Sequence, residues 1–506
     1  MRNFILLLCF CWIYSVPAQQ WDWVKNVSYT TTQEVSQLAP DSNSNFYLAT
    51  NSNSLTSCIT KFNVQGNQLW KLYLQGFLSI NGIVCAQGNV YITGAFSNSL
   101  QIGSYGLISN GSTDIFTACF TSNGNVVWAT SYGGAQEDIG SAVCADGSGN
   151  ILITGQYSGT ASFGTTSLVS QGGNNMFFAK LDPLGNILIL KSAGSQNTSA
   201  YGSRGQKIKS DLSGNIYVMG VCSDLVLDTL HRVGYGSTFI CKLDSMTTTK
   251  WVTLLNESYT IEGFDFILDL DGNMTVTGEY NGNHERAAIT KKYNSNGQLI
   301  WSRMIGTLSY GQWFQSNSIA TNGYDCFIVG AADDTYINSA RNNFFLLASY
   351  DSAGTRTILD TLYCGNIFNG NHAEGKSIVR DSNGDFVLAG NMKGNLKLGN
   401  DSLFTTTESV FIAKFKGTNS AVSVSEKNFL MRNNIYPNPS QGIFTIEMGE
   451  ADISTLCVYD AYGNCILQRV CNDRRVVIDL RSQPKGIYLI EIKDQNRHSV
   501  KKIIIQ

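Results

Sequence analysis

Short apolar segments alternate with polar turns along most of this chain. The apolar segments are four to six residues long and rich in Val, Ile, Phe and Tyr, and Gly, Asn, Asp and Ser separate them. This alternation is typical of β-strands joined by tight turns. After residue 18, no stretch of ten or more residues combines a 3.6-residue apolar period with capping signals. The pattern therefore predicts an all-β chain and excludes Rossmann folds, α/β barrels and helical bundles.

The strand pattern repeats, which decides the predicted architecture. A strand of the form GNIYVTG recurs at 45–50, 88–94, 149–155, 214–220, 272–278, 324–330 and 384–390. A second strand follows each copy, at 58–62, 116–120, 177–181, 239–243, 289–293, 346–350 and 411–415. A strand ending in an aromatic residue follows most copies, and another strand precedes the first. Four strands in roughly 59 residues suit one blade of a β-propeller.

The two ends of the repeat region complement each other. The seventh copy runs from 411–415 into a linker without its aromatic strand, whereas an isolated strand with Trp21 and Trp23 begins the region. An N-terminal strand that completes the last blade would close the ring and leave no exposed sheet edge. We therefore predict a seven-bladed β-propeller of four-stranded blades over residues 19–417.

Over residues 21–417 the repeat resembles a bacterial propeller family known as the SBBP repeat. The shared elements are the GNIYVTG-like strand, the FAKL-like strand and the following strand that ends in Trp. Copy five lacks the family's FG element, and copies three and six have Ile189 and Ile358 in place of Trp. The resemblance implies a propeller scaffold and no particular reaction.

Both termini carry segments of a different kind. Residues 1–18 combine Arg2, an apolar run and a small-residue end at Ala18, which predicts a cleaved secretory signal peptide. Residues 418–433 form a polar linker. Residues 434–506 contain only predicted strands and turns, among them a hairpin at 460–464, so we expect a small antiparallel Ig-like β-sandwich.

The C-terminal segment closely resembles the type A sorting domain of the type IX secretion system of Gram-negative bacteria. The matching residues are Tyr436, Pro437, Asn438, Pro439, Gly442, Asp460, Gly463, Gly486, Tyr488, Lys501 and Lys502. The resemblance implies export through the periplasm and then across the outer membrane, with the type IX secretion machinery as a partner. The product would be released or attached at the cell surface. The competing interpretation is an ordinary sandwich used as a binding module.

Composition narrows the classes of partner. The formal net charge is −3 and only 14% of the residues are charged, which argues against nucleic acid and anionic lipid as partners. Beyond the signal there is no apolar run long enough to span a membrane as a helix. We expect a monomer.

Candidate chemistry lies on one face of the predicted propeller. Turns on one face are tight, whereas loops at 95–114, 156–175, 195–204, 257–265 and 307–316 are long and irregular, so a ligand should bind on the long-loop face. Candidate ligand-binding residues in the inter-blade loops there are Glu137, Asp138, Glu262, Asp265, Trp313, His372 and Glu374. Carboxylates beside an aromatic ring suit sugar recognition. The alternative is that these residues are solvated or cap the loops.

Three functional hypotheses follow. The preferred one is a non-enzymatic surface or secreted propeller that binds a glycan or a surface protein. The alternative is a carbohydrate-active hydrolase or lyase that uses carboxylates on the long-loop face. The third is an adhesin in which the ring is only a spacer.

The sequence predicts no cofactor and no metal site. His231, His284 and His372 lack the spacing of metal ligands. The segment 269–273 resembles the start of a calcium loop, but Tyr280 occupies the position of the required bidentate Glu. Most cysteines lie within strands as small apolar residues, while Cys457, Cys465 and Cys471 leave open a disulfide in the C-terminal domain.

Overall fold

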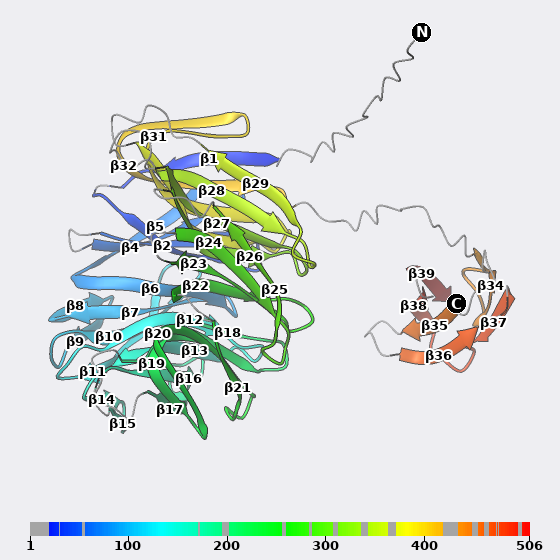
Figure 1. The fold of residues 1–506 in the computed structure, drawn as a ribbon, viewed down its shortest axis with the longest axis horizontal. Helices are drawn as coiled ribbons and strands as arrows, with labels where there is room; N and C mark the ends of the chain where they lie inside the picture. The colour runs from blue at the N-terminus through cyan, green and yellow to red at the C-terminus, as the bar shows by residue number, and fades with distance from the viewer. Residues whose placement is uncertain are drawn as a thin grey trace, which may run out of the picture. The chain divides into compact units, whose positions relative to one another are not determined.

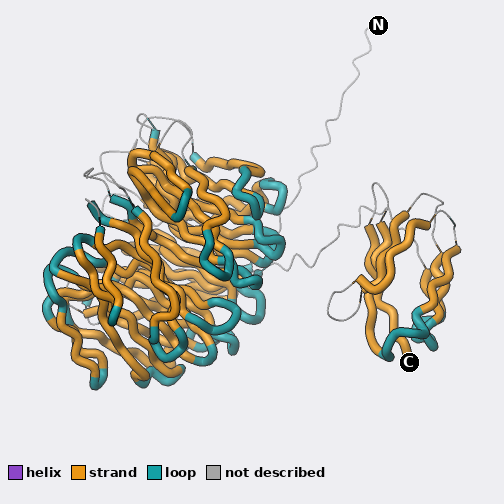
Figure 2. The backbone as a smooth tube through the Cα atoms, turned by 90° about the horizontal axis from the view of Figure 1, so that it is seen from below, coloured by secondary structure: helices purple, strands orange, loops and turns teal. Residues whose placement is uncertain are grey.

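The computed structural model divides the chain into two compact units, 1–418 and 419–506. The structure describes residues 20–29, 31–52, 56–170, 173–194, 202–255, 260–282, 286–306, 312–334, 343–362, 371–417, 434–447, 454–459, 465–471, 473, 475–493 and 498–506. The predicted signal peptide and linker lie outside these ranges. All regular elements in the described part are strands, as Figures 1 and 2 show, which confirms the all-β prediction.

The first unit repeats a four-stranded antiparallel meander. The first three sheets contain β2 (Glu34–Pro40), β3 (Phe46–Asn51), β4 (Thr56–Phe62) and β5 (Gln68–Gln75); β6 (Phe77–Ala86), β7 (Asn89–Ser97), β10 (Asp114–Thr121) and β11 (Val126–Gly134); and β12 (Ile139–Ala145), β13 (Ile151–Tyr157), β16 (Asn175–Leu181) and β17 (Ile187–Ala193). The next three contain β18 (Arg204–Ser210), β19 (Ile216–Leu227), β20 (Leu230–Leu243) and β21 (Thr249–Leu254); β22 (Thr260–Leu268), β23 (Met274–Asn281), β24 (Arg286–Tyr293) and β25 (Leu299–Ile305); and β26 (Gln312–Thr321), β27 (Cys326–Asp334), β28 (Asn343–Tyr350) and β29 (Arg356–Leu362).

A further sheet joins the two ends of the first unit. Its strands are β30 (His372–Arg380), β31 (Phe386–Leu398), β32 (Asp401–Phe415) and β1 (Trp21–Val27). β1 pairs antiparallel with β32, with Trp21 opposite Phe415 and Val27 opposite Val410. The N-terminal strand is therefore the outer strand of the sheet whose other three strands come from the end of the region.

The first strands of successive sheets contact one another in a cyclic order. β2 contacts β6, β6 contacts β12, and so on through β18, β22, β26 and β30, and β30 contacts β2. Each of these strands has a register shift at the same place in its sheet, for example between Val35 and Gln37 in β2 and between Ser316 and Ser318 in β26. The side chain of the extra residue bonds to the next sheet in several copies: Asn81 donates to the Gly140 carbonyl at 2.8 Å and Asn317 to the Gly375 carbonyl at 2.8 Å.

Tryptophans of the outer strands make the second repeated contact. The indole N–H groups of Trp70, Trp128, Trp251 and Trp301 donate, at 3.0 to 3.1 Å, to the turn between the last two strands of the following sheet. Beneath each ring lies a glycine of that turn, and a Cβ at these glycines would approach the ring to between 2.8 and 3.4 Å. Trp23 of β1 lies in the same way over Gly66, in the turn between β4 and β5.

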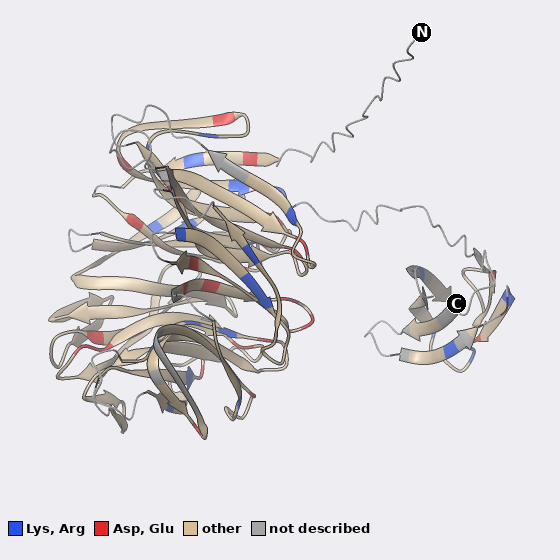
Figure 3. Cartoon of the chain, in the orientation of Figure 1, with Lys and Arg blue, Asp and Glu red and all other residues tan. Residues whose placement is uncertain are grey.

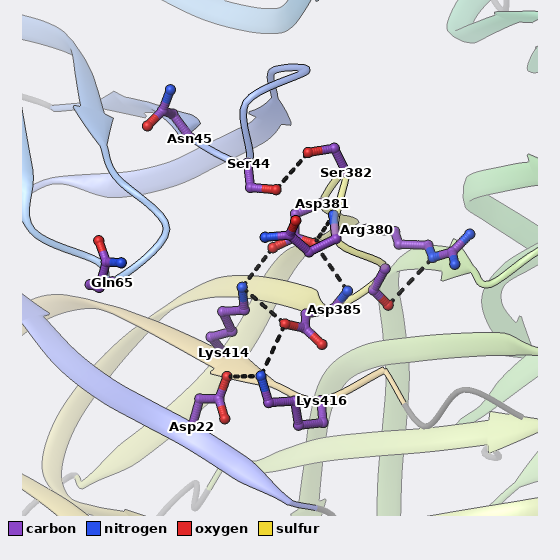
Figure 4. A network of polar contacts seen from close by, with 12 residues as sticks. Asp22, Ser44, Asn45, Gln65, Arg380, Asp381, Ser382, Asp385, Lys414 and Lys416 are labelled. Atoms are coloured by element: carbon purple, nitrogen blue, oxygen red, sulfur yellow. Dashed lines mark hydrogen bonds and ion pairs between the residues drawn. The ribbon is translucent and has the colours of Figure 1, made fainter. Parts of the chain in front are cut away.

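A network of charged residues also links β1 to its sheet (Figure 4). The buried Lys414 ammonium lies 2.6 Å from Asp381 and 3.1 Å from Asp385. Asp385 is 3.3 Å from Lys416, whose ammonium is 2.9 Å from Asp22 in β1. Because Lys414 and Asp381 are almost fully buried, each needs the other as a counter-charge.

Two loops expected to be irregular contain hairpins instead. β8 (Ser99–Ile102) pairs with β9 (Tyr105–Ile108), and β14 (Thr160–Phe163) pairs with β15 (Thr166–Val169). Apolar residues alternate with polar ones on both sides of a glycine, a hairpin signal that the length of the loop obscured. β14 also pairs with β11, so this hairpin ties the third sheet to the second.

The second unit contains two antiparallel sheets. One has β33 (Asn434–Tyr436), β34 (Ile443–Glu447) and β37 (Arg475–Asp479), and the other has β35 (Ser454–Tyr459), β36 (Cys465–Cys471), β38 (Gly486–Lys493) and β39 (His498–Ile505). Buried residues of both sheets form one core, including Phe444, Ile478, Leu456 and Ile490. The two layers are visible in Figure 2. The predicted hairpin at 460–464 lies outside the described residues.

Candidate functional site

Two glutamates lie opposite each other where β22 begins and β23 ends. Glu262 of β22 pairs in register with Glu279 of β23. Glu262 is exposed, whereas Glu279 is 7% exposed. This edge of the sheet carries the short connection from β23 to β24 and the connection from β25 to β26, which are on the face where the sequence analysis expects ligands. Four residues separate Asn281 from Arg286, too few for a covering hairpin like β8 and β9.

Trp313 and Arg286 complete a cluster around Glu279. The Trp313 indole N–H donates to Glu279 Oε1 at 3.1 Å, and Arg286 Nε lies 3.4 Å from the same oxygen. Trp313, near the start of β26, is partly exposed, and the Arg286 side chain is more than half exposed. We call Glu262, Glu279, Arg286 and Trp313 the Trp313 cluster. It spans two neighbouring sheets.

Burial controls the ionisation of Glu279. Desolvation raises the pKa of its carboxyl, and the charge of Glu262 raises the pKa further. The hydrogen bond from Trp313 and the charge of Arg286 oppose this shift. Glu279 thus holds the Trp313 indole and pairs with Arg286, while Glu262 and more than half of the Arg286 side chain face solvent. The cluster therefore combines an anchored aromatic ring with an exposed acceptor, Glu262, and an exposed donor, Arg286.

Glu374 lies in the next sheet, close to β26. Asn317 of β26 donates to Glu374 Oε1 at 2.8 Å, and the Lys376 ammonium lies 2.8 Å from Glu374 Oε2. His372, two residues earlier in β30, lies 3.1 Å from Glu408 of β32. Glu374 is thus linked to β26 through Asn317, and His372 is paired within its own sheet; none of these contacts joins either residue to the Trp313 cluster.

Asp265 accepts hydrogen bonds that hold the neighbouring strand β26. It is 8% exposed, and its Oδ2 accepts hydrogen bonds from the Ser318 hydroxyl at 3.0 Å and the Ile319 N–H at 3.3 Å. The Lys209 ammonium lies 3.6 Å from its other oxygen. These contacts connect the first strands of three consecutive sheets, so a ligand has little access to this carboxylate.

Glu137 and Asp138 lie between β11 and β12, in a different part of the unit. Glu137 is exposed and accepts a hydrogen bond from the Gln156 amide at 3.0 Å. Asp138 is fully buried and accepts from two backbone N–H groups. The structure therefore does not bring these two residues together with Trp313.

Sequence reasoning missed Glu279 and Arg286. Glu279 follows the GNMTVTG strand directly, at a position where the other copies have Asn51, Ala95, Gln156, Val221, Ala331 and Asn391. Comparing the copies at this position would have shown one charged residue among uncharged ones. Its partner Arg286 has no comparable signal.

The segment 269–273 folds as a hairpin turn. Asp269 Oδ1 accepts from the N–H groups of Asp271 and Asn273, and its Oδ2 lies 2.8 Å from the Lys292 ammonium. A cation already occupies the place that calcium would take. In the described part of the chain no three His, Cys, Asp or Glu residues gather as metal ligands. The side chains of His231, His284 and Cys465 lie outside the described residues, so the disulfide stays a prediction; Cys457 and Cys471 are buried.

Only 14% of the residues are charged, and both signs are present in similar number. Figure 3 shows acidic and basic residues scattered among many uncharged ones in the described part of the chain. No helix among the described residues is long and apolar enough to cross a membrane.

The motif at the start of the second unit holds the last strand in place. Asn438 Oδ1 accepts the Ile504 N–H at 3.0 Å, and the Ser440 N–H donates to the Ile504 carbonyl at 3.0 Å. The Tyr488 hydroxyl donates to the Pro484 carbonyl at 2.7 Å, and Tyr436 bonds to Glu447. Pro437 and Pro439, both preceded by cis peptide bonds, are exposed together with Lys501. Asp460, Gly463 and the side chain of Lys502 lie outside the described residues.

Comparison with known proteins identifies the family of residues 434–506. Residues 434–506 match the family model described as a secretion system C-terminal sorting domain. An endo-acting ulvan lyase of Formosa agariphila is 33% identical over 89 residues, which is 17% of this chain and 17% of that protein. The match therefore spans less than a fifth of the length of that relative.

Solved structures with a similar arrangement are distant in sequence. PorZ, a surface component of the type-IX secretion system of Porphyromonas gingivalis, is 11% identical, with 94% of this chain and 82% of that chain covered and a TM-score of 0.26. A PL25 ulvan lyase is 10% identical over 78% of this chain and 96% of its own, with a TM-score of 0.43. The WD40 domain of Neurospora crassa Pan2 is 10% identical over 75% of this chain and 89% of its own, with a TM-score of 0.44. At these values the likeness carries no inference about activity.

The assignment rests on the match to the family model, which covers residues 434–506 of the second unit. Residues 434–506 are a secretion system C-terminal sorting domain, and the protein that carries them is secreted or displayed at the cell surface.

Proposed function

We propose that this protein is an exported, non-enzymatic binding protein whose first unit is a seven-bladed β-propeller that binds a saccharide at the Trp313 cluster. The ring is supported by the cyclic contacts of the first strands and by the pairing of β1 with β32. The repeated contact of tryptophan with a glycine of the following sheet, including Trp23 with Gly66, supports an SBBP-type repeat.

The observation that carries the saccharide site is the anchoring of Trp313. Its indole N–H is held by the buried Glu279 carboxylate, so the ring has a defined orientation while it remains partly exposed. A pyranose ring stacks on such an aromatic face through its C–H groups. Glu262 can accept a hydroxyl hydrogen bond beside the ring, and Arg286 can donate one. Anchored aromatic side chains lose little conformational entropy on binding, which favours affinity.

The proposed export through the type IX route gives each terminal segment a role. In this proposal residues 1–18 direct passage to the periplasm, 418–433 form a linker, and 434–506 engage the type IX secretion machinery. The motif residues, from Tyr436 to Lys502, would be the recognition elements. The mature protein would be released or held on the outer surface of a Gram-negative bacterium.

A glycan-binding screen with the full mature chain tests the saccharide site. Trp313→Ala should reduce binding at least tenfold, because a lost stacking contact of about 1.5 kcal/mol corresponds to that factor. Tyr324→Ala is the matched control, since Tyr324 is 58% exposed in the turn between β26 and β27, at the other end of the same sheet. Equal losses in the two variants, or no loss in Trp313→Ala, would refute the assignment.

One observation favours an enzymatic alternative. Glu279, with its raised pKa, lies opposite the exposed Glu262, and a carboxyl pair with different environments can divide the roles of acid and base. A carbohydrate-active hydrolase or lyase would turn over a polysaccharide, and Glu279→Gln would abolish turnover. Binding without turnover in the same screen would leave the non-enzymatic proposal in place.

A further inference from the structure

A second acidic pair lies far along the chain from the Trp313 cluster. Asp114 is the first residue of β10, and Asp138 lies between β11 and β12. Both are 0% exposed. The Asp138 N–H donates to the Thr113 carbonyl at 2.7 Å, so the two segments that carry these residues are bound to each other through their backbones.

The two carboxylates differ in how fully they are bonded. Asp138 Oδ1 accepts the Ser158 N–H at 3.0 Å, and its Oδ2 accepts the Gly134 N–H at 2.7 Å. Asp114 Oδ2 accepts the Asn110 N–H at 3.0 Å, but Asp114 Oδ1 has no hydrogen-bond partner among the described residues. A fully buried carboxylate oxygen without a partner is costly, and a bound cation, a water molecule or a proton would each relieve that cost.

The unsatisfied oxygen and one oxygen of the neighbouring carboxylate both lie close to Gly133. A Cβ placed on Gly133 would lie 2.8 Å from Asp114 Oδ1 and 2.9 Å from Asp138 Oδ2, so both oxygens border the same position. Gly133 has a φ of 151°. A side chain at this residue would clash with both carboxylates, so the glycine lets the two acidic side chains approach each other.

Nothing in the described chain neutralises this pair. Neither carboxylate has a Lys, Arg or His partner, and the remaining neighbouring charge is the exposed Glu137, which is also negative. Burial raises the pKa of Asp114, and burial together with the nearby acidic residues raises the pKa of Asp138 to about 6. When both carboxyl groups are ionised, the site holds two like charges away from water, and a counter-ion would stabilise them.

We propose that Asp114 and Asp138 bind a hard divalent cation, for which calcium is the probe, and that this cation fastens the loop before β10 to the segment between β11 and β12. Carboxylate oxygens are the ligands that calcium prefers. Two carboxylates are fewer ligands than calcium needs, so further oxygen ligands would have to complete its shell. A dissociation constant of about 1 mM, as in weak extracellular sites, follows from this low count of charged ligands.

The experiment measures thermal unfolding of the full mature chain, stripped with a chelator, at about pH 8 with and without about 5 mM calcium. We expect a saturable rise in Tm and one terbium ion bound per chain. Asp114→Asn should lose both responses. This variant should still fold, because an amide oxygen can accept the Asn110 N–H as the carboxylate does. Asp351→Asn is the control, since Asp351 accepts two backbone N–H groups and has no paired carboxylate.

Two results would overturn the proposal. In the first, the wild-type chain shows an unchanged Tm with calcium and binds no terbium, and its stability instead rises as the pH falls through 6 in calcium-free buffer. That result would mean that the two carboxylates share a proton. The other is an equal calcium response in wild type and Asp114→Asn. The measurement uses no saccharide, so its failure is distinguishable from failure of the proposed binding function.

Discussion

Gly66→Ala tests whether the N-terminal strand completes the last sheet of the first unit. Gly66 has a φ of 72°, in the left-handed region, and a Cβ there would lie 2.8 Å from the Trp23 ring of β1. Gly88 has a φ of 78°, but nothing lies within 4 Å of its Cβ position. The two glycines therefore share the backbone strain of an alanine substitution and differ in the contact with Trp23.

The expected losses of stability follow from these two terms. An alanine in the left-handed region costs about 1–2 kcal/mol, which is the whole expected effect of Gly88→Ala. Gly66→Ala adds the cost of overpacking against a ring, typically about 1–3 kcal/mol. Gly66→Ala should thus lower the free energy of unfolding by about 2–5 kcal/mol, and by about 1–3 kcal/mol more than Gly88→Ala does.

Urea unfolding of the mature chain measures both losses, and a double-mutant cycle identifies their cause. Trp23→Ala should remove the excess cost of Gly66→Ala, which gives a coupling energy of about 1 kcal/mol or more. Equal losses at Gly66 and Gly88, together with additive effects of Trp23→Ala and Gly66→Ala, would refute the placement of β1 over this turn.

Three further outcomes are expected. Lys414→Ala should destabilise the chain by about 3–5 kcal/mol, because it leaves Asp381 buried without its counter-charge. Lys416→Ala, at a half-exposed position, should cost less than about 1 kcal/mol. Similar urea midpoints for the two variants would contradict the network. Glu279 has a raised pKa, so its ionisation opposes folding, and stability should fall as the pH rises from its ordinary value of 4.5 through the raised pKa. Glu279→Gln should make this part of the pH–stability curve less steep, with the remaining slope due to groups such as Asp138, and an unchanged slope would contradict the role of Glu279. Removal of residues 434–506 should leave the protein in the periplasm, as fractionation and immunoblotting would show; continued appearance in the medium or at the surface would contradict the sorting assignment.

The repeat made much of the first unit predictable from sequence. Each GNIYVTG-like strand and its FAKL-like partner became neighbouring strands, because period-two alternation and glycine turns act locally. The missing last strand of the seventh copy and the surplus strand with Trp21 and Trp23 indicated the pairing of β1 with β32. The hairpins at 99–108 and 160–169 were not anticipated, since loop length alone does not distinguish an irregular loop from a short hairpin.

The candidate site was less predictable because it depends on contacts between sheets. Trp313 and Glu262 were singled out as inter-blade residues, but the buried Glu279 that orients Trp313 lies inside a strand, and its partner is 34 residues away. Asp265 and Asp138 turned out to hold backbone N–H groups, which their positions in the sequence also allowed. The register between neighbouring sheets decides which of these carboxylates reach solvent, and a single sequence does not specify that register.

Hydrogen–deuterium exchange of the mature chain with and without a saccharide identified in the screen tests the central claim most directly. The account predicts slower exchange in peptides that cover 260–282 and 312–321, and unchanged exchange in the turn at 322–325 at the other end of the same sheet. Protection confined to other segments, with 260–282 and 312–321 unaffected, would contradict it.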